Sequence, residues 1–160
     1  MGSPWCWLAG EAVGGRAEWL PVHLAGGDVD RAAVEECAAS LGQPALRWPE
    51  PFPFDSRLAM LGATFAKETG RGVAFSLAAM RQAFLAGRAL DEMDNVLIAA
   101  AACELHPRAV LRGIETRGVA EALEAAGVRA LGLGVTVVPA IVARGRTWTG
   151  TEAIRAAGSA

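Results

Sequence analysis

The stretch Ser3-Pro4-Trp5-Cys6-Trp7-Leu8 lies close to the first residue of the chain. Proline favours the first turn of a helix, because its missing N–H would be unpaired there in any case. Ser3 then takes the N-cap position, next to the positive end of the helix dipole. Backbone N–H groups at that end stabilise a thiolate or another anion. The stretch therefore predicts a helix whose N-terminus presents Ser3 and Cys6.

The composition is that of one globular domain. Of the 160 residues, 52% are apolar, which is enough for a sizeable core. The formal net charge is −2 and no basic stripe is present, which argues against a nucleic-acid partner. The Ala-rich run at residues 96–103 is far too short to span a membrane. We therefore expect a protein that binds neither nucleic acids nor membranes.

The three cysteines, Cys6, Cys37 and Cys103, form no regular framework. An odd number without regular spacing argues against structural disulfides and indicates a reducing, cytoplasmic setting. The first residues do not have the basic and apolar regions of a signal peptide, which agrees with that expected localisation. His23 and His106 are far apart and have no metal-ligand spacing, so no metal site is expected.

Apolar periodicity and turn residues predict strands near the two ends of the chain and helices in its middle. A strand is predicted over 17–24, and strand-forming residues recur at 133–138, 140–143 and 146–149, with Arg144-Gly145 as a tight turn. Helices are predicted over about 31–41, 56–69, 73–86, 94–105, 108–115, 119–126 and 152–157. The expected N-caps include Asp28 or Asp30, Asp55 or Ser56, and Thr151. This order predicts an α/β domain with a helical insertion.

The N-terminal stretch resembles the active-site turn of DsbA-like thioredoxin-fold proteins. It is most similar to the branch of kappa-class glutathione transferases and 2-hydroxychromene-2-carboxylate isomerases, where a serine commonly replaces the first cysteine of Cys-Pro-x-Cys. A second segment resembles the family's cis-proline segment and the hairpin after it: Gly134-Val135-Thr136-Val137-Val138-Pro139-Ala140-Ile141-Val142, followed by residues 145–150. The residues from Trp48-Pro49 onward resemble the family's helical insertion.

The resemblance implies a single thioredoxin-like domain over residues 1–160. The thioredoxin part is expected at about 1–27 and 131–160, and the helical insertion at about 43–130. The family's first core strand, which precedes the Ser/Cys motif, is missing from this sequence. That strand is central in the family's sheet, so its loss would leave neighbouring strands with unpaired backbone groups. We expect a fragment, a misassigned start codon, or a sheet that has closed up.

The resemblance implies catalytic roles for Ser3 and Cys6, with Pro4 and Trp5 completing a thiol-binding turn. The Ser3 hydroxyl would hydrogen-bond a substrate thiolate, and the helix dipole would add roughly 0.3–1 kcal/mol. The alternative is that Ser3 only caps the helix. Cys6 takes the place of the family's second cysteine, but it has no thiol partner at position 3. The alternative for Cys6 is a small buried hydrophobic residue.

The resemblance also implies a binding role for Val138, Pro139 and Asp55. The backbone of Val138, beside a cis Pro139, would hold glutathione or a peptide; the alternative is a simple kink between strands. Asp55 and Arg57 would hold the charged groups of glutathione; the alternative is a helix cap beside a solvated charge. Three aromatic residues would line a substrate pocket unless they belong to the core: Trp5, Trp7 and Phe52.

Three functional hypotheses follow. The first is a thiol-dependent isomerase or transferase that uses glutathione or another low-molecular-weight thiol, without a metal, on a small aromatic substrate. The second is a DsbA-like thiol–disulfide oxidoreductase that works through Cys6 alone. The third is a degenerate, non-catalytic binding module that keeps the peptide groove beside Pro139. Whether the chain forms a homodimer, as kappa-type relatives do, is left open.

Overall fold

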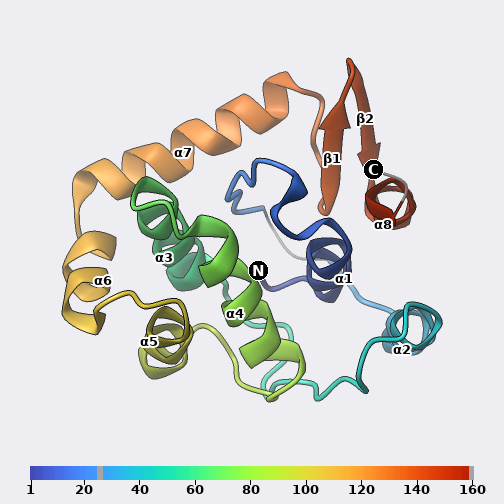
Figure 1. The fold of residues 1–160 in the computed structure, drawn as a ribbon, viewed down its shortest axis with the longest axis horizontal. Coiled ribbons are helices and arrows are strands. Elements are labelled where there is room, and N and C mark those ends of the chain that lie inside the picture. Colours follow the sequence, from blue (N-terminus) through green and yellow to red (C-terminus); the bar gives the residue numbers. More distant parts are fainter. Residues whose placement is uncertain (25–26, 159–160) are drawn as a thin grey trace.

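Helices make up most of the computed structural model, which describes residues 1–24 and 27–158 (Figure 1). In these residues two strands pair with each other to form a small sheet. In chain order the elements are α1 (Pro4–Val13), the 3-10 turn η1 (Gly14–Arg16), α2 (Arg31–Ser40), α3 (Arg57–Glu68), α4 (Gly72–Phe84), α5 (Met93–Ala102), α6 (Pro107–Ile114), α7 (Arg117–Gly132), β1 (Ala140–Ala143), β2 (Arg146–Thr149) and α8 (Gly150–Gly158).

Helix α1 is central to the packing. It lies against both α8 and α4, although these two helices are far apart in the sequence. Trp7 and Leu8 of α1 are fully buried in one core with Phe75 and Phe84 of α4. Helices α3, α5 and α6 extend this core on the other side of α4. The N-terminal motif is therefore built on a helix that packing holds in place.

Two helices begin at carboxylates among the caps that the sequence predicts. The Asp30 carboxylate accepts a hydrogen bond from the N–H of Ala33 (3.1 Å) at the start of α2. The Asp55 carboxylate accepts one from the N–H of Arg57 (2.9 Å) at the start of α3. These bonds satisfy donors that would otherwise be unpaired at a helix end. Helix α8 differs from its prediction, because it begins at Gly150, ahead of the expected cap.

The predicted C-terminal hairpin is confirmed. Strands β1 and β2 are antiparallel, with Ala140 opposite Thr149 and Ala143 opposite Arg146. The two turn residues, Arg144 and Gly145, have φ values of 50° and 73°. Positive φ at both positions is what a type I′ turn requires, and its twist matches that of the strands. Helix α8 packs against both strands of the hairpin.

Three predicted elements are wrong. Residues 17–24 form no strand, and residues 133–138 form turns and bends. A strand needs a neighbouring chain for its N–H and C=O groups, and local residue preference does not supply one.

The predicted helix over 119–126 is too short, since α7 continues through Gly127 to Gly132. A glycine inside a helix costs only about 1 kcal/mol, which a long helix tolerates.

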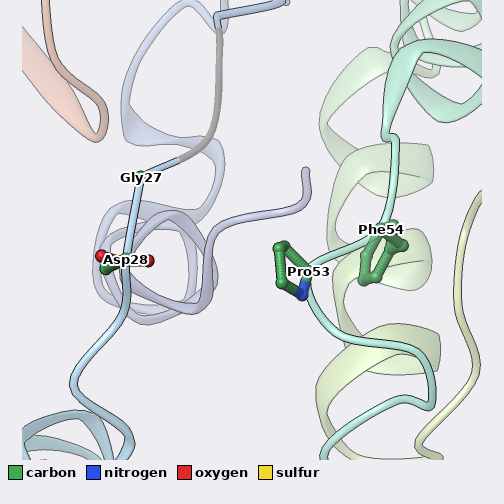
Figure 2. A pocket seen from close by; sticks show the side chains of 4 residues that line it. All are labelled: Gly27, Asp28, Pro53 and Phe54. Carbon is green, nitrogen blue, oxygen red and sulfur yellow. The ribbon is translucent and has the colours of Figure 1, made fainter.

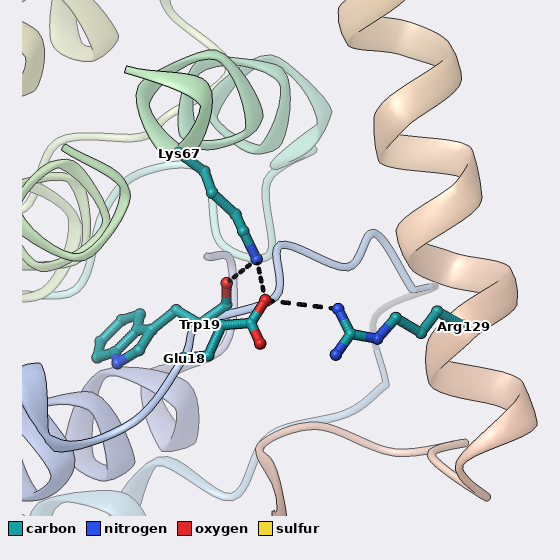
Figure 3. Close-up of polar contacts among 4 residues, drawn as sticks. All are labelled: Glu18, Trp19, Lys67 and Arg129. Carbon is teal, nitrogen blue, oxygen red and sulfur yellow. Dashed lines mark hydrogen bonds and ion pairs between the residues drawn. The ribbon is translucent and has the colours of Figure 1, made fainter. Parts of the chain in front are cut away.

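Side chains tie the segment 17–24 to two helices (Figure 3). The Lys67 ammonium of α3 donates to the Glu18 carboxylate (2.7 Å) and to the Trp19 carbonyl (2.9 Å). The Arg129 guanidinium of α7 lies 3.4 Å from the same carboxylate. Hydrogen bonds from Lys67 and then Arg129 lower the pKa of Glu18. This part of the chain is therefore held by side chains, although it belongs to no sheet.

Candidate functional site

Ser3 and Pro4 build the N-terminus of α1. Ser3 has an extended backbone (φ −105°, ψ 123°), and its carbonyl accepts the N–H groups of Cys6 (3.0 Å) and Trp7 (3.3 Å). Its side chain does not bond to the N–H groups of the first turn, as a capping serine would. The side chain of Ser3 therefore does not meet the cap alternative. Because Pro4 has no N–H and those of Cys6 and Trp7 donate to the Ser3 carbonyl, the N–H of Trp5 is the first-turn donor that no described backbone acceptor uses.

Cys6 lies in the first turn of α1 and is a free thiol. It is partly buried and packs against the core cluster. Burial raises the pKa of this thiol above its ordinary value, against the smaller opposing effects of the Met1 amino group and the Ser3 hydroxyl. A thiol with a raised pKa stays protonated at neutral pH. Burial therefore disfavours the thiolate form of Cys6, which is the form that attacks in disulfide exchange.

The aromatic residues of the motif take two different positions. Trp7 is completely buried, stacks on Phe84 with a centroid distance of 6.2 Å, and belongs to the core. The expectation that Trp7 lines a substrate pocket is therefore wrong. Phe52 packs edge-to-face against Trp48 (5.0 Å) and against Phe84 (6.3 Å). Trp5 and Phe52 are both half-buried at the rim of the core, and only Trp7 of the three is enclosed by it.

The loop before α3 lies directly against the residue that precedes Ser3. A Cβ atom at Gly2 would lie 3.3 Å from the Ser56 Cβ and 3.5 Å from the Phe54 carbonyl oxygen. The N-terminus of α1 and the N-terminus of α3 are therefore neighbours. Asp55, between the two contacting residues, is brought close to the Ser3 region, as a shared binding site requires.

Asp55 already has partners. Its carboxylate accepts the Arg57 N–H and lies 3.1 Å from the His23 Nε2. The Arg57 N–H, and then His23, lower the pKa of Asp55, so the carboxylate is ionised at neutral pH. Asp55 accepts a helix N–H, as its cap alternative predicted, and the Asp55 side chain remains largely exposed. His23 was not expected here, because a separation of 32 residues gives no local signal of this pair.

A pocket of about 520 Å³ lies beside this loop, lined by Gly27, Asp28, Pro53 and Phe54 (Figure 2). Its two walls come from separate loops, and in Figure 2 the chain that leads into α1 passes between them. Volumes of this order suit a small molecule. The pocket is thus open to solvent near the first residues of the chain, on the side of the molecule where Asp55 lies.

The peptide bond between Val138 and Pro139 is cis. The Pro139 carbonyl accepts the N–H of Gly150 (2.8 Å), which joins the start of β1 to the start of α8. In the described part of the chain no hydrogen bond connects this peptide to Ser3 or Cys6. Of the predicted site residues, the first turn of α1 holds four together: Ser3, Pro4, Trp5 and Cys6. The loop before α3, which contains Asp55, contacts the chain at Gly2. Val138 and Pro139 precede β1, and α8 packs against both β1 and α1.

Glu11 and Arg81 form a polar link that the sequence did not reveal. The Arg81 guanidinium of α4 donates to both oxygens of the Glu11 carboxylate of α1, each at 2.7 Å. The Trp7 indole N–H adds a third hydrogen bond (3.0 Å). The i,i+4 spacing of Trp7 and Glu11 is a signal for one of these contacts. Arg81 is 70 residues away from Glu11, and no spacing indicates that pair.

The described part of the chain has neither a cluster of metal-ligand side chains nor a helix suited to a bilayer. Among residues 1–24 and 27–158, no group of three or more His, Cys, Asp or Glu side chains could hold a metal ion. No helix there combines the length and the apolar character needed to cross a bilayer.

Cys103 is buried and its thiol donates to helix carbonyls, that of Ala100 at 3.2 Å among them. Burial raises the pKa of this thiol.

Comparison with known proteins places the fold. No family model matches the sequence, and no curated protein matches it. Two solved structures match almost the whole chain. A 2-hydroxychromene-2-carboxylate isomerase has a TM-score of 0.72 at 15% identity, covering 99% of this chain and 89% of the isomerase. A candidate protein disulfide isomerase from Nitrosomonas europaea has a TM-score of 0.73 at 16% identity, covering 97% of this chain and 90% of that protein.

The chain has the fold of these proteins. This confirms the thioredoxin-like fold with a helical insertion that the resemblance predicts. The two matching structures carry descriptions of different activities, a 2-hydroxychromene-2-carboxylate isomerase and a candidate protein disulfide isomerase. At this identity the likeness concerns the fold, so the activity must be argued from the site itself.

Proposed function

We propose that this protein is a thiol-dependent isomerase or transferase. In this proposal the N-terminus of α1 binds the thiolate of glutathione or another low-molecular-weight thiol. A small aromatic molecule is the second substrate. The observation that supports it most directly is the Ser3 side chain, which occupies the N-cap position without bonding to the first-turn amides. Its hydroxyl remains able to donate a hydrogen bond to a ligand.

Three groups would act on the thiolate in this proposal. The Ser3 hydroxyl would donate to the sulfur, the N–H of Trp5 would contribute a second donor, and the helix dipole would favour the negative charge. Hydrogen bonds to a charged partner are worth about 1.5–3 kcal/mol each. The thiolate would then add to an electrophilic carbon of the aromatic substrate. In isomerisation it leaves again unchanged. In transfer it stays bound as a thioether, and the carbanion formed by the addition takes a proton from water, which balances the proton lost when the thiol ionised.

The pocket and the loop before α3 are where we expect the rest of the thiol to bind. The Asp55 carboxylate is ionised, exposed and close to the N-terminus of α1, so it suits the α-amino group of glutathione. The Val138–Pro139 peptide is a candidate for backbone hydrogen bonds to the thiol. The half-buried Trp5 offers an apolar surface for the aromatic substrate.

Cys6 is not the nucleophile in this proposal. A nucleophile in disulfide exchange must be a thiolate, and burial raises the pKa of Cys6. The position 3 partner is a hydroxyl, which cannot complete a disulfide. These two observations favour the thiol-binding hypothesis over a disulfide oxidoreductase that works through Cys6 alone.

The test is the ionisation of bound glutathione, followed by the ultraviolet absorbance of the thiolate. We expect the pKa of the bound thiol to fall below the ordinary value of about 8.5 for a cysteine thiol. Ser3→Ala should weaken binding of the thiolate form about tenfold or more, since 1.4 kcal/mol corresponds to a factor of ten. Ser3→Thr keeps the hydroxyl and should restore the shift.

S-methylglutathione, which cannot ionise at sulfur, is the matched control ligand. Its affinity should be the same for the original chain and for Ser3→Ala. If glutathione binds with an unshifted thiol pKa, or if Ser3→Ala changes nothing, the proposal is wrong. Insulin reduction that disappears in Cys6→Ser would support the disulfide oxidoreductase instead.

A further inference from the structure

His23 and Asp55 form a pair beside the start of α3, and this pair uses only one of the two carboxylate oxygens. The His23 Nε2 lies 3.1 Å from the Asp55 Oδ1, and the Arg57 N–H donates to the same oxygen at 2.9 Å. No described group bonds to the other oxygen, Oδ2. The Asp55 side chain is 68% exposed, so a ligand can reach Oδ2 from solvent.

The hydrogen in this pair belongs to His23. The Asp55 carboxylate is ionised, because the Arg57 N–H, and then His23, lower its pKa, and an ionised carboxylate can only accept hydrogen bonds. The His23 Nε2 therefore carries the hydrogen, which leaves Nδ1 as the bare nitrogen of the neutral ring. A neutral imidazole orients the carboxylate without cancelling its negative charge, whereas a lysine or arginine in the same place would cancel it.

Two donors on one oxygen fix the orientation of the carboxylate. The last torsion of an aspartate side chain has a broad range, so the bond to the Arg57 N–H alone leaves the carboxylate free to turn. His23 approaches from a different segment of the chain. That segment is itself held to α3, because the Lys67 ammonium donates to the Trp19 carbonyl at 2.9 Å. His23 therefore adds a second, independent anchor, and the two anchors together set the direction of Oδ2.

The place of Asp55 suits one end of a ligand whose other end lies at the N-terminus of α1. Pro53 and Phe54, directly before Asp55, line the pocket of about 520 Å³ (Figure 2). The same loop contacts the chain at Gly2, next to Ser3. An exposed carboxylate oxygen binds an ammonium group by a charge-assisted hydrogen bond. A thiol that carries a primary ammonium group can therefore use both places at once.

We propose that His23 is a positioning residue, which makes the site selective for thiols with a free primary ammonium group by holding Asp55 in place. This inference rests on the proposed function and adds the residue that sets its choice of thiol. His23 acts through Oδ1, and the ammonium group of the ligand binds Oδ2. Without His23 the carboxylate turns freely, and the ammonium contact weakens. A thiol whose amino group is acylated has no charge to place there, so its binding does not depend on His23.

Titration calorimetry with two ligands tests this role. S-methylglutathione keeps the ammonium group, and N-acetyl-S-methylglutathione lacks it. We expect the original chain to bind the first at least about tenfold more tightly than the second, since one charge-assisted hydrogen bond separates them. His23→Leu should lower this ratio of affinities about threefold or more, because it removes one hydrogen bond to Asp55. His23→Gln offers an amide N–H at a similar distance from the backbone and should keep the ratio.

The ratio isolates the role of His23 from other effects. Damage to the fold lowers both affinities together and leaves the ratio as it was. Neither ligand ionises at sulfur, so an unshifted thiol pKa of bound glutathione would contradict the proposed function without changing this ratio. Equal affinities of the original chain for the two ligands overturn the inference, as does a chain that binds neither. A His23→Leu variant that keeps the full ratio overturns it, and so does a His23→Gln variant that loses as much as His23→Leu.

Discussion

Gly113 is a residue whose missing side chain allows two helices to touch. It lies in α6 facing the ring of Phe65 in α3, and a Cβ atom there would overlap that ring near its attachment point. The ring cannot escape by rotating its far end, because the overlap is close to its base. Gly127 in α7 is the opposite case, since a Cβ atom there has open space around it. Substitutions at these two helical glycines therefore separate the effect of packing on stability from the effect of helix propensity.

At the residue scale we predict opposite effects for alanine at these two positions. Gly113→Ala should destabilise the protein by about 1–3 kcal/mol, the usual range for overpacking, because the clash outweighs the gain in helix propensity. Gly127→Ala should stabilise it by about 0.5–1 kcal/mol. Urea unfolding of both variants measures the difference. Equal effects of the same sign would contradict the contact between Gly113 of α6 and Phe65 of α3.

At the scale of elements, the Glu11–Arg81 pair holds α1 against α4. Glu11 is only 12% exposed, whereas Arg81 is 52% exposed, so solvent screens one partner more than the other. The hydrogen bonds of Arg81, and to a smaller extent that of Trp7, lower the pKa of Glu11 against the opposing effect of burial. A carboxyl whose pKa is lower in the folded protein stabilises the fold at pH values above its unfolded-state pKa, which is about 4.3. That contribution is lost as the pH falls through the folded pKa.

We therefore predict a pH-dependent loss of stability in Glu11→Gln. At neutral pH the free energy of unfolding should fall by about 1–2 kcal/mol, less than for a fully buried charge-assisted bond because Arg81 is half exposed. The difference from the original chain should shrink below about pH 4, where the unfolded carboxyl is already protonated. Urea unfolding across a pH series provides the measurement. Glu121→Gln is the control, because its i,i+4 pair with Arg117 is exposed. A difference that does not vary with pH would rule out this role of Glu11.

At the scale of the whole molecule, Glu18 joins three distant parts of the chain. Lys67 is the only lysine in the sequence, and it connects α3 to Glu18 and Trp19, while Arg129 adds α7 (Figure 3). Segment 17–24 has no sheet to hold it, so these bonds limit its opening. Exposed ion pairs contribute little to global stability. Their effect is expected in the local opening of the segment.

We predict that Lys67→Met speeds amide hydrogen exchange in residues 17–24 severalfold, with little change in Tm. The Trp19 carbonyl and the Glu18 carboxylate both lose a donor in this variant. Arg71→Gln, which breaks the exposed pair between the start of α4 and Glu104 after α5, should leave exchange in 17–24 unchanged. Exchange that rises equally in both variants would show that the segment does not depend on Lys67.

Local signals predicted the helix starts well. Asp30, Asp55 and the prolines in the first turns of α1 and α6 act on amides within three residues, so the sequence alone reveals them. The hairpin at Arg144-Gly145 belongs to the same class, because its turn depends on two adjacent residues. The failures are the segments at 17–24 and 133–138. Their residues favour strands, but no described neighbour pairs with them, and pairing is not a local property.

The sequence by itself determined that α1 begins at Ser3-Pro4, that helices fill the middle of the chain, and that a hairpin lies near its C-terminus. Capping, periodicity and turn geometry are short-range effects, so the residues involved are neighbours in the sequence. Only the tertiary structure decided that the Ser3 hydroxyl makes no cap, that Trp7 belongs to the core, and that Asp55 and His23 pair beside the N-terminus of α1. Burial and long-range contact set those outcomes, and they depend on which distant segments pack together.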